Sequence, residues 1–169
     1  GKSVQGKLLA DDLGYRWLST GEFLRMHISG DRRKEMLAGK LLADEEIIAI
    51  LDKFLIDSNI DEACVLDGFP RTLPQAEWLL GQHNSGDVKL RGVVHLVASK
   101  STVMERLLAR GRQDDTREAI EQRFAEYEEQ TLPIVDWFRE EGIAVHEIDG
   151  ERSIEAIHID IMRAIQQRQ

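Results

Sequence analysis

The residues best suited to chemistry in this sequence are those that can bind phosphate. The chain opens on Gly1, Lys2 and Ser3, the triplet that ends a phosphate-binding loop of the form GxxxxGK[ST]. A helix beginning there would present free backbone N–H groups and a positive dipole end to an anion. Lys2 would then reach the terminal phosphates and Ser3 would lie near a metal. Taken alone, the triplet is better explained as the arbitrary start of a solvated helix.

The segment CVLDGFPRT, residues 64–72, carries a stronger signal. Asp67 ends a predicted strand, where a carboxylate can hold a metal-bound water in a P-loop protein. Arg71 offers a planar guanidinium for a phosphate, and Pro70 fixes the turn that directs it. The alternative is a helix start with solvated charges. The ordered run of these residue types favours a functional site.

Arginines are concentrated in the C-terminal half of the chain: Arg106, Arg110, Arg112 and Arg123. The first two lie four residues apart, so they share one face of a predicted helix. The last lies near the apolar face of the next predicted helix, where its charge needs a partner such as a bound phosphate. Salt bridges with Asp114, Asp115 and nearby glutamates explain this run equally well. Arg25 can likewise be explained either by a bound phosphate or by a salt bridge.

Short β-branched segments alternate with longer helical ones and position these residues. We expect strands at 15–19, 63–67, 92–97 and 143–148. The segment 115–141 is predicted to be helical with a break at Pro133, and the last helix carries a stripe of Ile154, Ile157, Ile161 and Ile165. Residues 20–57 have the pattern of several helices inserted between two strands. The sequence therefore predicts one α/β domain with a parallel sheet covered on both faces.

The composition of the 169-residue chain limits the classes of function. A net charge of −9 argues against a general nucleic-acid binder. No apolar run approaches the roughly 20 residues of a membrane span, and the start has no signal-peptide pattern. The single cysteine, Cys64, excludes an internal disulfide and a cysteine-based zinc site, and we expect its thiol to be buried. These features predict a cytoplasmic protein.

The motifs, in order, resemble those of the adenylate kinase family. STGEFLR at 19–25 is similar to the family's STGD-x-LR, and AGKLLADEEI at 38–47 to its GxLVxDE segment. LDGFPRTLPQAEWL at 66–79 is close to the family signature. The segment 105–135 resembles the arginine-bearing C-terminal half, and DG at 149–150 matches the loop before the last helix. The resemblance covers nearly the whole chain.

The resemblance implies a P-loop nucleoside-triphosphatase fold of three α/β/α layers, a helical AMP-binding insertion at 20–57, and the reaction ATP + AMP ⇌ 2 ADP. It implies that AMP is held by the following residues: Thr20, Arg25, Lys40, Leu41, Leu42, Gly68, Arg71 and Gln75. Gln75 would read the adenine edge. ATP would contact another set: Gly1, Lys2, Ser3, Arg106, Gly150 and Arg152. The transferring phosphoryl group would be surrounded by a third: Lys2, Arg71, Arg110, Arg112 and Arg123.

Mg²⁺ is the implied cofactor; it would bridge the ATP phosphates, with its waters held by Asp67 and with Ser3 nearby. We expect no zinc, no nucleic-acid or membrane partner, and a monomer. Pyrimidine monophosphate kinases share this fold but usually have Ala where Thr20 stands and Asn where Gln75 stands, so AMP is favoured over UMP and CMP. A catalytically inactive nucleotide-binding paralogue is the other alternative, and the retained arginines argue against it.

The sequence departs from the family pattern in two places. Only Gly111 separates Arg110 from Arg112, so the lid expected between the arginine clusters is reduced to residues 111–115, with Asp114 and Asp115. In the family a strand, normally central in the sheet, and a glycine-rich loop precede the Gly-Lys-Ser triplet; this sequence holds neither before Gly1. If nothing precedes Gly1, we expect poor ATP binding and little catalysis.

Overall fold

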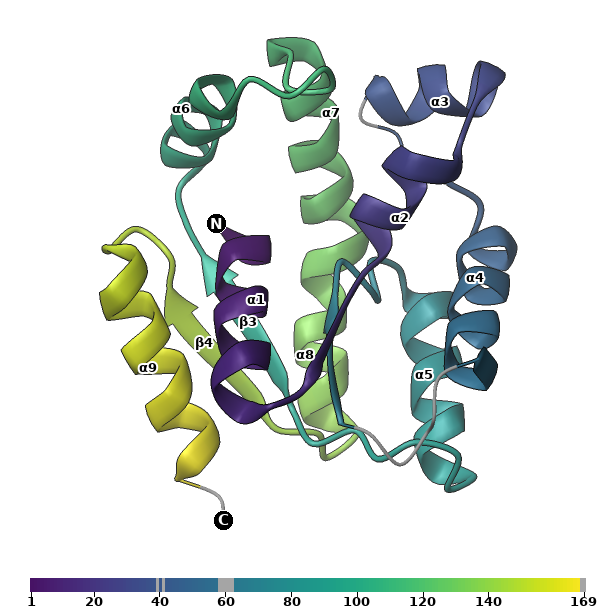
Figure 1. Ribbon diagram of the computed structural model, residues 1–169, viewed down its shortest axis with the longest axis vertical. Coiled ribbons are helices and arrows are strands. Elements are labelled where there is room, and N and C mark those ends of the chain that lie inside the picture. The colour runs from purple at the N-terminus through teal and green to yellow at the C-terminus, as the bar shows by residue number, and fades with distance from the viewer. Residues whose placement is uncertain (39, 41, 58–62, 168–169) are drawn as a thin grey trace.

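The computed structural model describes residues 1–38, 40, 42–57 and 63–167 of the chain (Figure 1). In chain order its elements are α1 (Lys2–Leu13), β1 (Arg16–Ser19), α2 (Thr20–His27), α3 (Gly30–Leu37), α4 (Asp44–Asp57), β2 (Cys64–Asp67), α5 (Leu73–Asn84), β3 (Val93–Val97), α6 (Lys100–Arg110), α7 (Arg117–Glu126), the π-helical turn η1 (Tyr127–Thr131), α8 (Leu132–Glu140), β4 (Val145–Asp149) and α9 (Ile154–Gln166). This alternation confirms the predicted α/β class.

The strands form two parallel pairs. β1 pairs with β2, which sets Ser19 opposite Asp67, and β3 pairs with β4, which sets Val97 opposite Asp149. The two strands of each pair therefore have their carboxyl ends side by side, and open α/β folds bind their ligands beyond these ends. The residues expected to do chemistry at 67–71 and 150–152 follow these ends directly.

The sheet differs from the single one that the sequence predicts, because β1–β2 and β3–β4 form separate two-stranded sheets. Among the described residues no strand bonds to the facing edges of β2 and β3, and an open groove of about 1470 Å³ lies there. The same groove corrects the expectation for Cys64. Its side chain is exposed, because it stands at the start of β2 and lines the groove.

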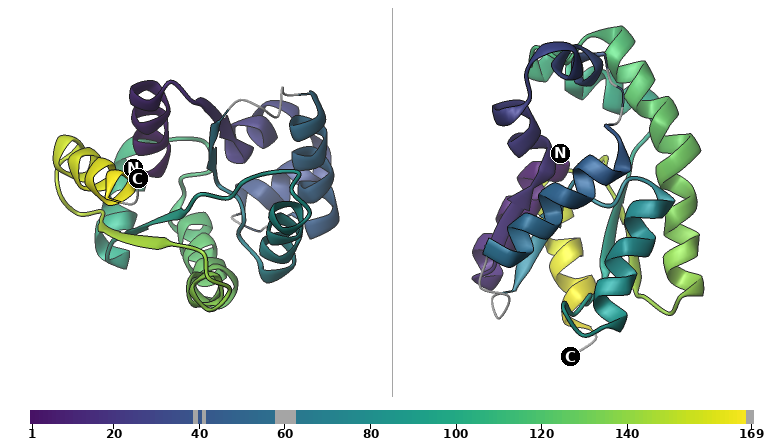
Figure 2. Two further views of the ribbon diagram at one scale, coloured as in Figure 1. Left: turned by 90° about the horizontal axis from the view of Figure 1, so that it is seen from below. Right: turned by 90° about the vertical axis from the view of Figure 1, so that its right-hand side faces the viewer.

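Helices lie on two sides of the strands. α1 packs against α9 on one side, around Leu9, Ile157 and Ile161. α8 lies on the opposite side of the molecule from α1, as both views of Figure 2 show, and packs against α5 and β4 around Phe138, which is 1% exposed. The predicted isoleucine stripe of α9 is correct except for Ile154, which is exposed because it begins the helix beyond the packed turns.

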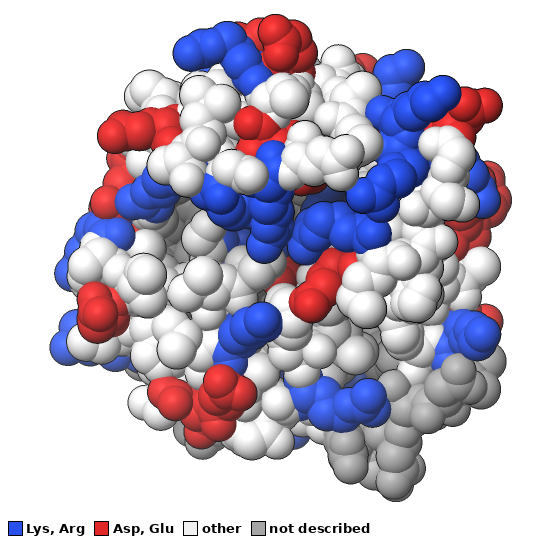
Figure 3. Space-filling view, turned by 45° about the horizontal axis from the view of Figure 1, so that its top comes forward, with Lys and Arg blue, Asp and Glu red and all other residues white. Residues whose placement is uncertain are grey.

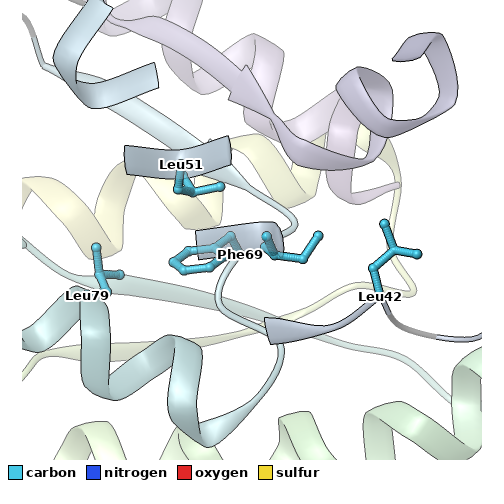
Figure 4. Close-up of a cluster of buried hydrophobic side chains, with 5 residues drawn as sticks. Leu42, Leu51, Phe69 and Leu79 are labelled. Carbon is cyan, nitrogen blue, oxygen red and sulfur yellow. The ribbon is translucent and has the colours of Figure 1, made fainter. Parts of the chain in front are cut away.

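The segment 20–57 contributes α2, α3 and α4, and no strand is found among its described residues. It is joined to the rest of the molecule by an apolar cluster, shown in Figure 4, of Leu42, Ile47, Leu51, Phe69 and Leu79. Phe69 lies next to Gly68 in the loop after β2, so this cluster attaches the inserted helices to the loop that carries the candidate site.

The helical segment 115–141 breaks earlier than Pro133. The π-helical turn η1 separates α7 from α8 just before the proline, which occupies the first turn of α8. Proline has no N–H to give to a preceding helix, and a π turn is a recognised way to absorb such an irregularity. The turn also points Thr131 at the candidate site, as described below.

Candidate active site

The loop after β2 brings several predicted residues into contact at Gly68. The Thr20 hydroxyl lies 3.3 Å from the carbonyl oxygen of Asp67, and Arg71 Nε donates to the carbonyl of Gly68 at 2.9 Å. Gly68 has φ +87°, and a Cβ there would lie 2.7 Å from Thr20 Oγ1, 3.2 Å from Arg71 Nη2 and 3.6 Å from Lys2 Nζ. Glycine is therefore required by both the backbone and the space.

Asp67 is the buried acid of this site, with a side chain 2% exposed. It forms an ion pair with Lys2 and accepts hydrogen bonds from Ser3 and, at 3.1 Å, from Trp17 Nε1. Burial alone would raise the pKa of Asp67, but the Lys2 charge and these hydrogen bonds outweigh it and the pKa is lowered. The acid thus stays ionised and holds Lys2 at the start of α1.

The pKa of Lys2 is lowered as well, first by desolvation and then by the Arg71 guanidinium, while Asp67 opposes the change. Two cations thus stand near one carboxylate, which is ion-paired with Lys2 and also acts electrostatically on Arg71. Such a pair favours binding of a further anion, because a phosphate would relieve the repulsion between them.

Three of the four arginines of the C-terminal half, all except Arg106, bond to Asp115, whose side chain is fully buried. Arg110 binds the carboxylate through two hydrogen bonds of 2.8 and 2.7 Å, and Arg123 Nη2 donates to it at 3.0 Å. The backbone N–H of Arg112 adds a fourth bond at 3.0 Å. Arg123 also contacts Asp114, through its carbonyl oxygen at 2.8 Å and its carboxylate at 3.5 Å. The salt-bridged arrangement that the sequence allowed is present, and it holds these guanidinium groups together.

Asp115 makes stability depend on pH in a defined range. Burial alone would raise its pKa, but Arg110, Arg123 and the Arg112 N–H lower it from 3.8 to about 2. A carboxyl with a depressed folded-state pKa stabilises the fold above its unfolded value and loses that contribution as the pH falls through the folded value. We expect the contribution to be constant above about pH 5 and to disappear between about pH 4 and pH 2. Urea unfolding of Asp115→Asn and the parent protein across this range tests this; parallel pH profiles would contradict it.

Two hollows adjoin at this end of the molecule. The smaller pocket is lined by residues of the inserted helices and the β2 loop, among them Thr20, Arg25, Lys40, Leu42 and Gln75. The lining of the groove between the two sheets includes Lys2, Ser3, Arg106, Arg110 and Arg112. The walls common to both include the following residues: Gly21, Arg25, Gly68, Arg71 and Arg123. Figure 3 shows Lys and Arg side chains gathered around the hollowed part of this face.

Most of the predicted AMP-binding residues meet in the smaller pocket. Thr20 is buried, and Gln75 is 2% exposed at its wall. The backbone N–H of Lys40 is already bonded to the carbonyl of Glu35 at 3.0 Å, so the main chain offers no donor at that residue. Leu41 lies outside the residues that the structure describes.

The predicted ATP-binding residues are only partly brought together by the structure. Arg106 donates to the carbonyl of Gly150 at 2.5 Å and of Glu151 at 3.1 Å, which joins α6 to the loop after β4. Gly1, Lys2 and Ser3 line the groove, as does Gly150. The Arg152 guanidinium, in the loop before α9, forms an ion pair with Asp160 of that helix.

The sequence did not indicate several residues that hold the site. Thr131 donates to the carbonyl of Arg71 at 2.6 Å, and Asp44 accepts from Thr72 at 2.6 Å and from Gln75 at 3.0 Å. Trp17 donates its indole N–H to Asp67 at 3.1 Å. The sequence carried one signal for Asp44: it begins an acidic run, and carboxylates are favoured at the N-terminus of a helix.

No helix among the described residues has the length and apolar character needed to span a membrane. Nor do the residues within these ranges include any group of three His, Cys, Asp or Glu side chains arranged to hold a metal.

Comparison with known proteins agrees with this geometry. The family model described as adenylate kinase matches residues 1–143. A protein named adenylate kinase from Corynebacterium aurimucosum is 35% identical over 98% of this chain and 93% of its own length. Another of that name from Prochlorococcus marinus strain MIT 9211 is 36% identical over 98% of this chain and 91% of its own. A third, from Corynebacterium urealyticum, is 36% identical over 93% of this chain and 88% of its own. The chain therefore belongs to the adenylate kinase family.

Proposed function

We propose that this protein transfers a phosphoryl group reversibly between ATP and AMP to give two ADP, with AMP in the smaller pocket and ATP in the groove. The observation that carries this assignment is the wall that pocket and groove share. Arg71 and Arg123 line both, so both can contact a phosphoryl group passing between two nucleotides. In-line transfer requires such an arrangement, with donor and acceptor on opposite sides of one cluster of positive charge.

The chemistry rests on charge and position. The acceptor is an ionised phosphate oxygen, so no general base is needed. Lys2, Arg71, Arg110, Arg112 and Arg123 would neutralise the oxygens of the transferring group, the largest contribution that a protein can make to this reaction. Asp115 holds Arg110 and Arg123 in place before substrate binds, which reduces reorganisation during the reaction.

The residues near Lys2 fit a magnesium ion bound together with ATP. Asp67 is ionised, and Ser3 adds a hydroxyl beside it. Mg²⁺ prefers such hard oxygen donors and usually keeps several of its waters, which Asp67 would hold by hydrogen bonds. When bound, the ion neutralises charge on the phosphate oxygens.

The inserted helices are proposed to close over AMP, with residues 111–115 as a much shortened lid over ATP. Arg33 Nη2 already donates to Gln113 at 3.2 Å, which joins α3 to that short loop. We further propose that the protein is a monomer that acts in the cytoplasm on small nucleotides, without nucleic-acid or membrane partners. The net charge of −9 supports the absence of a nucleic-acid partner.

A pair of arginine variants tests which hollow takes which nucleotide. Arg25 lies on the wall that the two hollows share, where the family resemblance assigns it to the AMP phosphate, whereas Arg106 lines only the groove. In the full-length protein we expect Arg25→Ala to raise the KM for AMP about tenfold or more with little change for ATP, and Arg106→Ala to do the reverse. Steady-state kinetics with each nucleotide varied in turn measures both. Equal effects on the two KM values would contradict the assignment.

A further inference from the structure

The carboxamide of Gln75 is held at both of its polar atoms. Its Oε1 accepts from the backbone N–H of Arg71 at 2.8 Å, and its Nε2 donates to Asp44 Oδ1 at 3.0 Å. These partners determine which end is oxygen and which is nitrogen. A flip by 180° would place the NH₂ group against an N–H donor and the carbonyl oxygen against a carboxylate, and both contacts are repulsive.

Asp44 is itself held in place. The Thr72 hydroxyl donates to the same Oδ1 at 2.6 Å, and Thr72 is the N-cap of α5, accepting from the backbone N–H of Gln75 at 3.4 Å. Thr72 and Gln75 are 4% and 2% exposed. The first turn of α4 is thus tied to the first turn of α5 through one carboxylate, and the charge on Asp44 makes its bond to Gln75 stronger than a neutral one.

These two bonds leave the carboxamide with one N–H and one lone pair for a ligand, since a primary amide has two of each. The 6-aminopurine edge offers an N–H donor at N6 and an acceptor at N1. The 6-oxopurine edge offers the reverse, an acceptor at O6 and a donor at N1. A carboxamide that cannot flip pairs with one of these edges and leaves unpaired polar groups against the other. The cost of these unpaired groups lets the pocket discriminate between 6-amino and 6-oxo purines.

We propose that Asp44 is a specificity-determining positioning residue, which fixes the Gln75 carboxamide in one orientation and so selects 6-amino over 6-oxo purine monophosphates. This inference rests on the proposed function, because it requires that the small pocket take AMP. Asp44 acts through Gln75 and does not itself contact the base. It would make adenine recognition depend on the junction between α4 and α5.

Equilibrium binding of AMP and of inosine monophosphate to the full-length protein tests the proposal. The second ligand has oxygen at position 6 and a proton on N1. Asp44→Asn keeps the shape of the side chain and can offer either an acceptor or a donor to Gln75. We expect it to lower the preference for AMP over inosine monophosphate by about tenfold, since a charge-assisted hydrogen bond is lost. Glu45→Gln, which removes a charge from the same helical turn at an exposed position, should leave the preference unchanged.

A ligand-free measurement accompanies the binding assay. The side-chain NH₂ signals of Gln75, identified by their loss in Gln75→Asn, should show one proton shifted by the carboxylate in the parent protein and in Glu45→Gln, but not in Asp44→Asn. An unchanged AMP preference together with unchanged NH₂ signals in Asp44→Asn would overturn the proposal. Failure of the parent protein to bind AMP would instead overturn the assignment of the pocket.

Discussion

Replacing Arg71 with alanine is expected to lower turnover about a thousandfold in the full-length protein, because a single arginine on a transferring phosphoryl group contributes on that scale. Arg71 lines both the pocket and the groove, and its Nη2 would lie 3.2 Å from a Cβ at Gly68. Its side chain donates one hydrogen bond, from Nε to Gly68, and the bonds of its backbone to Gln75 and Thr131 do not depend on the side chain. The free energy of unfolding should therefore fall by only about 1 kcal/mol.

Two further variants serve as comparisons, one at Arg71 itself and one at a distant arginine. Arg71→Lys keeps the charge but not the planar fork, so we expect it to restore only part of the lost turnover. Arg139→Ala removes an arginine whose partners are Asp136 and Glu147 on the far helix and strand, and it should leave turnover unchanged. Near-normal turnover in Arg71→Ala, with urea unfolding curves showing an intact fold, would contradict the assignment of the site.

The substitution Gly68→Ala is expected to have the largest effect on stability of any small change in the site, about 3 kcal/mol. Part of this loss of stability comes from the backbone, since φ at residue 68 is +87° and a Cβ is unfavourable at that angle. The rest is crowding, because the new carbon would lie 2.7 Å from Thr20 Oγ1 and 3.2 Å from Arg71 Nη2. Thr20 and Arg71 would both have to move, so AMP binding should weaken as well.

Gly142→Ala is the matched control for the backbone part. Gly142 has φ +82°, but a Cβ there would have no atom within 4 Å. Gly142→Ala should lower the free energy of unfolding by only about 1 kcal/mol and leave AMP binding unchanged. Denaturant unfolding of both variants measures the difference. Equal losses of stability in the two would show that crowding at Gly68 is absent.

The sequence predicted the order of elements well, because each is encoded locally. The strands at 64–67 and 93–97 are short β-branched runs, and the run from Asp67 to Arg71 is a continuous stretch of loop. Once these strands are parallel, their carboxyl ends bring the following residues to one edge of the molecule. Arg71, Gly68 and Lys2 meet there for this reason.

The supporting contacts could not be predicted, because they join residues far apart in the chain. Thr131, which donates to Arg71, lies in the π turn η1, and no periodicity of side chains encodes that turn. Asp44 and Gln75 meet through the packing of α4 on α5. Asp114 and Asp115 were predicted as a reduced lid, whereas Asp115 is also the centre that holds three arginines. The exposure of Cys64 likewise depends on what lies beside β2 and not on its apolar neighbours.

Phosphoryl transfer from ATP to AMP can be followed as the rate of ADP formation. The full-length protein is supplied with Mg²⁺ and ATP, and with AMP, CMP or UMP in parallel reactions. We expect rapid formation of two ADP for each AMP consumed, and much slower reaction with CMP and UMP. Activity confined to a pyrimidine monophosphate, or no reaction with any of the three, would contradict it.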